Sequence, residues 1–526
     1  MRNFGQITLY LLAMLVTTSC AQQTPLTVDA SELNALASGT LLRDTVGLYP
    51  RVIQLAHNGA NNGRILASVV TFENNNGLGA IYESTDGGES FTQVGTVADP
   101  DAAGGKGLCC GTLYEVPQRV GDTPAGTLFW AASVGQDSGP NRRMALRIWK
   151  SNDVGRSWNY LSSCAVSPNA GGLWEPEFSV DGGGRLVCHF ADETEQPNYS
   201  QFLARTVSRD GGKTWGPKEK TVASTNSEYR PGMPIVRKLP DNTYLMTYEI
   251  CALPGQYDCA VFLRTSKRGN NWGEVTNLGR RVSSNTGRYF THTPVIALSP
   301  DGKILMSGQL LQNRDGSTAE GNGTTLMVNL ANGEGTWYEI PAPVEVPDAY
   351  NNFCPNYSSP LLPLDGGSKV LEIATDRDEV DCRAYYATGP VPDTFAVNDS
   401  TLGSANGQFD YSDLWSYGTG CAEGCFGGDD HFTNVAGAEV TLHFYGSQVT
   451  LYGARDPGHG MAEVSIDGKK KTLVDYYAPS RQNQEAVYTS PSLRLGQHTL
   501  TLKLTGTKNP ASRNTFVTVD RADVRY

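Results

Sequence analysis

The chain is 526 residues long, carries a net charge of −12 at neutral pH and contains 58 glycines. It has no basic block, which argues against nucleic acid or an anionic membrane as a partner. Short strand-like runs with frequent turns, and no long amphipathic helical periods, indicate an all-β protein. We expect a monomer.

Residues 1–21 predict a secretory signal peptide. Arg2 supplies the positive charge, residues 7–16 form an apolar run too short to span a bilayer, and Ser19-Cys20-Ala21 offers small residues for cleavage. A lipoprotein attached through Cys20 is the less favoured alternative, because residues 17–19 make a poor lipobox. The protein is therefore predicted to be secreted and extracellular.

Removal of Cys20 leaves ten of the eleven cysteines, an even number that suggests disulfides in an exported protein. Cys109 and Cys110 are adjacent, and we expect them to bond to two different partners rather than to each other. Two pairs are close enough for local bridges: Cys251 with Cys259, and Cys421 with Cys425. Four sequons would suit N-glycosylation in a eukaryotic host: Asn198, Asn322, Asn356 and Asn398.

A short pattern, Ser/Thr-x-Asp-x-Gly-x-x-Trp/Phe, recurs down the first half of the chain. Its copies begin at Ser84, Ser151, Ser208 and Thr265, and the last has Lys267 in place of the Asp. Asp followed by Gly is turn chemistry, and the aromatic ring closes the turn from below. Each copy follows a short strand, so we expect it to join two outer strands of a four-stranded blade in a structural role.

Residues 22–398 are predicted to form a six-bladed β-propeller, since the region from about 40 to about 398 holds six units of roughly 60 residues. Four turn-flanked runs have the pattern of first or second blade strands: 64–70, 186–190, 244–248 and 304–308. The last blade is expected to include residues 370–374 and 384–388.

Residues 399–408 read as a polar linker, and residues 409–526 as a second unit. Strands are expected at 439–444, 449–452, 462–466 and 498–504, with a hairpin signal at Asp467-Gly468. This pattern predicts a β-sandwich of the jelly-roll type.

Two carboxylates stand out within the predicted propeller. Glu175 precedes a strand and hairpin, and Glu249 ends the run that begins at residue 244; each lies beside an aromatic residue, Trp174 or Tyr248. A charge at the end of an apolar strand is costly without a partner. Glycoside hydrolysis needs such a pair, one as acid and one as nucleophile or base. Glu175 and Glu249 are the predicted catalytic residues, and Glu177 is a nearby substitute for Glu175.

Further residues at the starts or ends of inner strands are predicted to frame the pocket and bind substrate: Arg51, Trp174, Asp192, Arg230, Tyr248, His292 and Tyr357. Each of them has packing against a loop as its alternative role. The seven histidines show no ligand spacing, so no metal and no cofactor are predicted.

The repeated pattern resembles the Asp-box of sialidase-like propellers. Leu173-Trp174-Glu175-Pro176 and the segment ending in Tyr248-Glu249 look like the corresponding segments of glycoside hydrolase family 93, over about residues 45–390. The resemblance implies a secreted, exo-acting enzyme on linear α-1,5-L-arabinan, with a retaining mechanism that uses Glu175 and Glu249. The second unit resembles galactose-binding-like carbohydrate-binding modules, which implies a role in holding the enzyme on plant cell-wall polysaccharide.

Two alternatives remain open. A sialidase clamps a carboxylate with three arginines, for which Arg51, Arg230 and either Arg288 or Arg377 are candidates, with Tyr357 as the nucleophilic tyrosine. In a non-catalytic glycan-binding propeller, the acidic strand ends would accept hydrogen bonds from sugar hydroxyls.

Overall fold

The computed structural model describes residues 37–378, 380–421 and 424–526. The predicted signal peptide, with Cys20, lies outside these residues. The described part is built of strands, and it contains no helix long and apolar enough to cross a membrane. Its helical segments are short 3-10 turns: η1 (Gly59–Asn61), η2 (Pro100–Ala102), η3 (Gly255–Tyr257), η4 (Asp365–Gly367) and η6 (Phe426–Gly428).

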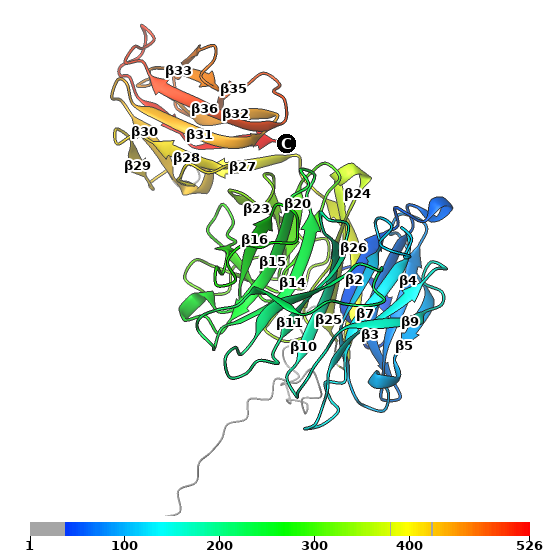
Figure 1. Cartoon of the computed structure of the whole chain (residues 1–526). Coiled ribbons are helices and arrows are strands. Elements are labelled where there is room, and N and C mark those ends of the chain that lie inside the picture. Colours follow the sequence, from blue (N-terminus) through cyan, green and yellow to red (C-terminus); the bar gives the residue numbers. More distant parts are fainter. Residues whose placement is uncertain (1–36, 379, 422–423) are drawn as a thin grey trace, which may run out of the picture.

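Six antiparallel sheets within the described residues form a propeller (Figure 1). The first three blades are β2 (Leu48–Gln54), β3 (Ile65–Glu73), β4 (Asn76–Ser84) and β5 (Thr92–Ala98); β6 (Leu108–Glu115), β7 (Leu128–Val134), β8 (Ala145–Ser151) and β9 (Asn159–Val166); and β10 (Leu173–Val180), β11 (Leu186–Asp192), β12 (Phe202–Ser208) and β13 (Glu219–Val222).

The remaining blades are less regular. They are β14 (Arg230–Lys238), β15 (Tyr244–Cys251), β16 (Ala260–Ser266) and β17 (Arg280–Arg281), extended by β18 (Tyr289–Thr291) and β21 (Leu310–Gln312); β19 (Val295–Leu298), β20 (Ile304–Ser307), β22 (Thr325–Asn329) and β23 (Trp337–Pro341); and β24 (Leu361–Leu364), β25 (Lys369–Arg377) and β26 (Cys382–Pro390), completed by β1 (Thr40–Arg43).

The first strands of the blades line the centre of the propeller. β2, β6, β10, β14, β19 and β24 contact one another in that order, and β24 contacts β2, so they close a ring. The four predicted runs fall in second strands, namely β3, β11, β15 and β20, and the last-blade segments fall in β25 and β26. The prediction of six blades is confirmed.

The repeated pattern forms one turn between the third and fourth strands of the first three blades. In the first copy the Ser84 hydroxyl donates to Asp86 at 2.7 Å and accepts from the Gly88 N–H at 2.9 Å. Ser151 and Ser208 make the same pair of hydrogen bonds.

The fourth copy corrects the predicted register. The Gly269 N–H donates to the hydroxyl of Ser266 at 2.9 Å, not to that of Thr265. The reason lies in the strand: Ser266 is the last residue of β16, as Ser84 is of β4, and the turn that follows is one residue shorter.

The second unit is a β-sandwich, as predicted. Its sheets contain β27 (Thr394–Asn398), β38 (Arg521–Arg525), β32 (Gln448–Arg455) and β35 (Gln482–Thr489); β28 (Gln408–Tyr411), β31 (Glu439–Gly446), β36 (Gly496–Leu504), β33 (Met461–Ile466) and β34 (Thr472–Asp475); and β29 (Ser416–Gly418), β30 (Asp430–Thr433) and β37 (Val517–Val519). Alternating apolar residues of β31 and β36 fill the core between the sheets.

The two units are joined differently from the expected linker. β27 precedes residue 399 but pairs with β38 of the sandwich. Thr336 of the fifth blade donates from its N–H to the Asn406 carbonyl at 2.9 Å, and the Tyr526 hydroxyl donates to the Asp301 carbonyl at 2.7 Å. The sandwich therefore packs on the fifth blade, as Figure 1 shows, and is not connected to the propeller by a free linker alone.

The disulfides confirm both local bridges and overturn one prediction. Cys109 bonds to Cys110, because the backbone at Cys110 takes a φ of 61° and breaks the alternation that would point neighbouring side chains to opposite faces. Two of the sequons are also corrected, since Asn322 and Asn356 are buried with their side-chain amides hydrogen-bonded. The five bridges are Cys109–Cys110, Cys164–Cys188, Cys251–Cys259, Cys354–Cys382 and Cys421–Cys425.

Candidate active site

One end of the ring carries a backbone feature that recurs in every blade. At or just before each first strand a non-glycine residue has positive φ: Tyr49 (48°), Cys110 (61°), Glu175 (52°), Met233 (58°), His292 (61°) and Asn356 (53°). In the first four blades the strand register also shifts there, as in a β-bulge. Such conformations cost roughly 1 kcal/mol or more each and cluster at functional sites.

These positive-φ segments contact one another around and across the ring. The Ser358 N–H donates to the Thr293 hydroxyl at 3.0 Å, which links the sixth blade to the fifth. The Tyr49 hydroxyl lies 3.8 Å from the Met233 sulfur, which links the first blade to the fourth. Contacts therefore join these segments in pairs at the mouth of the propeller, both between adjacent blades and across the ring.

Glu175 lies in the bulge of the third blade. Its side chain is half-buried, and Oε2 accepts a hydrogen bond from the Met233 N–H at 3.3 Å. Burial, and then the charge of Glu249, raise the pKa of Glu175 to about 8, against the opposing effects of the Met233 N–H and Arg230. Glu175 is therefore protonated at neutral pH and can act as a proton donor.

Glu249 projects from β15 of the neighbouring blade. Its Oε2 accepts a hydrogen bond from the Thr293 N–H at 2.6 Å, and it is also half-buried. Burial raises the pKa of Glu249 to about 7, and the Thr293 N–H and Arg230 act in the opposite direction. The ionised form of Glu175 is thus favoured by the Met233 N–H, and that of Glu249 by the Thr293 N–H.

A backbone segment of β14 separates the two glutamates. Gly232 is the ladder partner of Glu249, and a Cβ at Gly232 would lie 3.6 Å from Glu249 Oε1 and 2.6 Å from the Gln201 amide nitrogen. Met233, the next residue, donates to Glu175. Sequence reasoning missed both residues, although the Pro231-Gly232 dipeptide inside a strand pattern is a signal for close backbone approach.

Arg230 supplies the positive charge of the site. Its Nη2 pairs with Glu193 and donates to Gln201 Oε1 at 2.7 Å, and its Nη1 donates to the Ser200 hydroxyl at 2.8 Å. Its charge lowers the pKa of both Glu175 and Glu249. Protein partners therefore occupy the Arg230 donors, and its role in substrate binding stays a prediction.

Aromatic residues and Arg51 line the same mouth. The Arg51 guanidinium lies 4.2 Å from the Tyr49 ring centre, and its Nη1 donates to the Ser358 hydroxyl at 3.0 Å. The half-buried Tyr357 ring lies 6.2 Å from that of Tyr49. Trp174 is mostly buried beside Glu175. Tyr49 and Trp174 are thus packed inside the protein, and Tyr357 is the most exposed ring of the three.

Two predicted substrate-binding residues point elsewhere. Tyr248 is fully buried, and its hydroxyl donates to the Leu278 carbonyl at 2.7 Å, because alternation along β15 sends it to the face opposite Glu249. Asp192 is also fully buried, with one oxygen bound by Lys218 at 2.8 Å and the other by Thr194 at 2.7 Å. The structure does not support contact between either residue and a substrate.

Glu177, the predicted substitute for Glu175, is a structural residue. It is buried, pairs with Arg237 and accepts a hydrogen bond from Thr112 at 3.2 Å. Of the arginines predicted for a sialidase clamp, Arg288 pairs with Glu339 at 3.0 Å, and Arg51 and Arg230 are held by protein acceptors.

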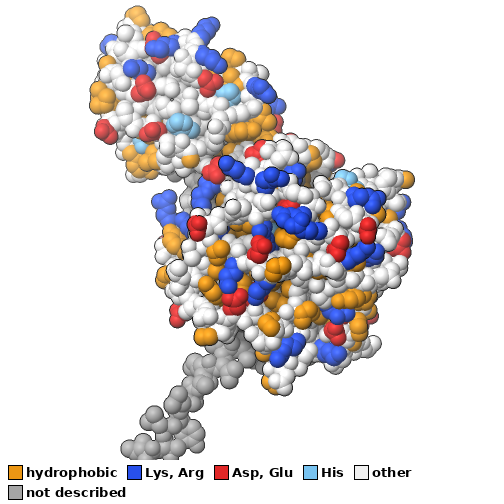
Figure 2. Space-filling model, viewed as in Figure 1, with side chains coloured by type: hydrophobic (Ala, Val, Ile, Leu, Met, Phe, Trp, Pro, Cys, Tyr) orange, Lys and Arg blue, Asp and Glu red, His pale blue; other side chains and the backbone are white. Residues whose placement is uncertain are grey.

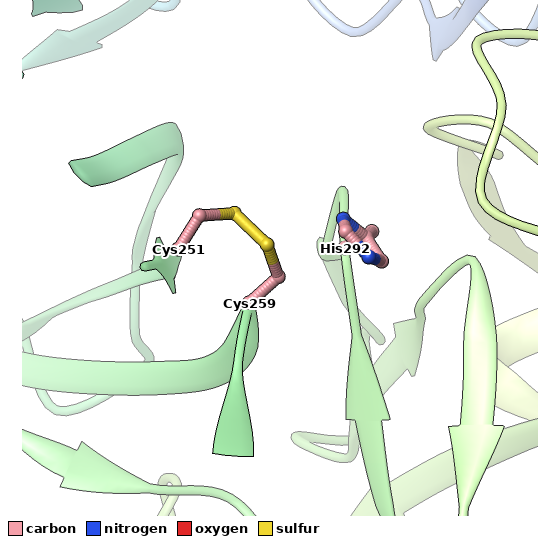
Figure 3. Close-up of side chains that lie close together, drawn as sticks. All are labelled: Cys251, Cys259 and His292. Atoms are coloured by element: carbon pink, nitrogen blue, oxygen red, sulfur yellow. A yellow bond between two sulfur atoms is a disulfide. The ribbon is translucent and has the colours of Figure 1, made fainter. Parts of the chain in front are cut away.

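His292 lies beside the Cys251–Cys259 disulfide (Figure 3), and the N–H of its neighbour Thr293 donates to Glu249. The imidazole is half-buried, and burial lowers its pKa, so it is neutral at physiological pH. On the face shown in Figure 2, acidic and basic side chains are interspersed over the propeller, without one large patch of either sign.

The arrangement is that of a propeller whose mouth holds two carboxylates with raised pKa values, supported by backbone N–H groups and one arginine. No family model matches the chain. The solved α-L-arabinanase of Penicillium chrysogenum, in complex with arabinobiose, is 26% identical to it, with a TM-score of 0.55 over 68% of this chain and 98% of that one.

A second solved structure has the same fold. The α-L-arabinofuranosidase of Fusarium graminearum, a member of glycoside hydrolase family 93, is 21% identical with a TM-score of 0.55 over 68% of this chain and 98% of its own. Among curated proteins, the A type blood N-acetyl-α-D-galactosamine deacetylase of Flavonifractor plautii is 34% identical over 73 residues, which is 14% of this chain and 9% of the deacetylase. The propeller is thus similar in fold to solved carbohydrate-active enzymes.

Proposed function

We propose that this protein is a secreted, retaining glycoside hydrolase that acts in exo mode on linear α-1,5-L-arabinan, with Glu175 and Glu249 as its catalytic residues. The observation that carries the proposal is the pair of half-buried carboxylates with raised pKa values on adjoining blades. The likeness to the Penicillium arabinanase supports arabinan as the substrate. The disulfides support secretion.

The different surroundings of the two carboxylates suggest their roles. Glu175 has the higher pKa and donates its proton to the glycosidic oxygen as that bond breaks. Glu249, whose ionised form accepts the 2.6 Å hydrogen bond from Thr293, attacks the anomeric carbon to form a covalent glycosyl-enzyme. Glu175, now ionised, takes a proton from water, which cleaves that intermediate with net retention.

The β-sandwich is proposed to bind the polysaccharide. Its packing on the fifth blade would present a surface fixed relative to the propeller mouth, rather than a mobile tether. Retention of the catalytically inactive double variant Glu175→Gln/Glu249→Gln on insoluble arabinan would test this without turnover of the polymer.

The experiment that tests the main proposal is a product profile. Purified protein is incubated with linear α-1,5-arabinan and, separately, with sialyllactose. Release of one short arabino-oligosaccharide from the start, with the α-anomer as first product by proton NMR, supports exo action with retention. Free sialic acid would revive the sialidase alternative, and inactivity on all glycans would favour a binding propeller.

A further inference from the structure

The corner of the site behind Glu249 contains two sulfur atoms and an imidazole. Cys251 ends β15, Cys259 precedes β16 and His292 lies between β18 and β19. One potential ligand atom from each residue lies within 4.8 Å of the other two, and Figure 3 shows His292 beside the disulfide. The His292 N–H donates to the Cys259 carbonyl at 2.9 Å, which fixes the two segments side by side.

Glu249 lies next to the Cys251 sulfur of this cluster. Its Oε1 lies 3.6 Å from the Cys251 sulfur, because residues 249 and 251 project from the same face of β15. Its other oxygen is held by Thr293, the neighbour of His292. Two sulfurs and one imidazole therefore lie together, and the Glu249 carboxylate lies next to one of the sulfurs, that of Cys251.

We propose that reduction of the Cys251–Cys259 disulfide converts this corner into a binding site for a thiophilic divalent cation such as Zn²⁺, with Cys251, Cys259 and His292 as ligands and Glu249 beside the open fourth position. While the disulfide is intact, its sulfurs are not thiolates and do not ligate. Ligand atoms around tetrahedral zinc lie roughly 3.5–4 Å apart, so the two sulfurs would move apart once their bond is broken, while a ring nitrogen of His292 already lies within 4.8 Å of both.

The chemistry balances with a phosphine as the reductant. The phosphine gives two electrons to the S–S bond and takes an oxygen atom from water, which supplies the two thiol protons. Each thiol then releases its proton when its sulfur binds the metal. Phosphine also avoids the zinc binding of dithiol reductants.

Metal binding would have a functional consequence that rests on the proposed role of Glu249. A cation in this corner would neutralise or ligate that carboxylate and stop its attack on the substrate. The binding itself does not depend on the proposed reaction, so the two ideas can fail separately.

The first test opens only this disulfide and needs no reductant. The Cys251→His variant places a second imidazole beside the Cys259 thiol and His292, while the other four bridges remain. We expect about one equivalent of Zn²⁺ per chain by equilibrium dialysis and elemental analysis. The double variant Cys251→His/His292→Ala should bind Zn²⁺ at least about 10-fold more weakly. In the matched control Cys421→His, replacement of His292 by Ala should leave any zinc binding unchanged.

The second test uses the wild-type chain, so its result does not depend on whether the Cys251→His variant folds. Phosphine-reduced protein, confirmed as folded by its melting curve, should bind one more equivalent of Zn²⁺ than reduced Cys251→Ser/Cys259→Ser. It should also lose glycosidase activity on addition of zinc and regain it with a chelator. Folded Cys251→His without zinc affinity, or equal zinc content in the two reduced proteins, overturns the proposal.

Discussion

Glu249 faces Gly232 directly across the β14–β15 ladder, and a Cβ at Gly232 would lie 3.6 Å from the glutamate oxygen. The same hypothetical Cβ would lie 2.6 Å from the amide of Gln201, whose oxygen accepts a hydrogen bond from Arg230. The absence of a side chain at Gly232 therefore allows the carboxylate, the amide and the guanidinium to share one small space.

Gly232→Ala should lower kcat/KM without unfolding the protein. The added methyl group displaces the Gln201 amide and with it Arg230, and misplacement of a catalytic constellation by about 1 Å costs up to about 100-fold in rate. Steady-state kinetics, with the melting temperature as control, checks this. A fully active Gly232→Ala protein would show that Gln201 does not position Arg230.

Replacement of either glutamate by glutamine should abolish turnover while leaving the fold intact. Loss of one acid–base group costs about 100- to 10,000-fold in kcat, and loss of the nucleophile removes the covalent route. Glu228→Gln is the matched control, since Glu228 is an exposed acid close to Arg230 in sequence. Turnover that survives in Glu175→Gln and Glu249→Gln would refute the two-glutamate mechanism.

The pH profile of kcat/KM should be a bell with its maximum between about 7 and 8. Activity requires Glu175 protonated, so it falls as pH rises through the pKa of about 8. It requires Glu249 ionised, so it falls as pH drops through the pKa of about 7. An optimum near pH 4 would contradict the raised pKa values.

Glu372 offers a separate test of stability against pH. It is 1% exposed, accepts only the Val344 N–H in the described structure, and burial raises its pKa from 4.5 to about 8. Because the folded pKa is the higher one, its contribution to stability is present below pH 4.5 and is lost as pH rises toward 8. Glu372→Gln should therefore flatten the decline in melting temperature over this range, whereas exposed Glu345→Gln should not.

The fourth turn can be tested with adjacent residues. Ser266→Ala removes the hydroxyl that accepts the Gly269 N–H and should destabilise the protein by about 1 kcal/mol in urea unfolding. Thr265→Ala, one residue earlier and exposed, should be close to neutral. A larger loss of stability in Thr265→Ala than in Ser266→Ala would instead support the register expected from the sequence, in which the turn begins at Thr265.

Much of the fold follows from local patterns, because a blade is a sequence of short-range hairpins. The second strands and the repeated turns are of this kind, and each was predictable from alternation or from Ser, Asp and Gly at fixed offsets. Glu249 stood out because a charge at the end of an apolar strand needs an explanation, whereas Glu175, which was expected just before a strand, lies inside β10.

The residues around the glutamates were harder to predict, since their orientation depends on bulges and on partners from other strands and blades. Tyr248 is adjacent to Glu249 but faces away, and Asp192 ends a strand but is bound by Lys218, which lies just before β13. The pairing of Cys109 with Cys110 depends on a single positive φ that the sequence does not mark. Backbone donors such as Met233 and Thr293 leave no trace in side-chain chemistry.

The sixth blade is shared between the two ends of the propeller, since β1 pairs with β26. Thr40 is the ladder partner of Tyr386, so nearly the whole propeller must be synthesised before the first strand finds its place. During translation the early blades therefore emerge while β1 is still unpaired, and the ring closes only when β26 has left the ribosome. Completion of the sixth blade, rather than of any earlier one, is the event that protects the exposed strand edges from other chains.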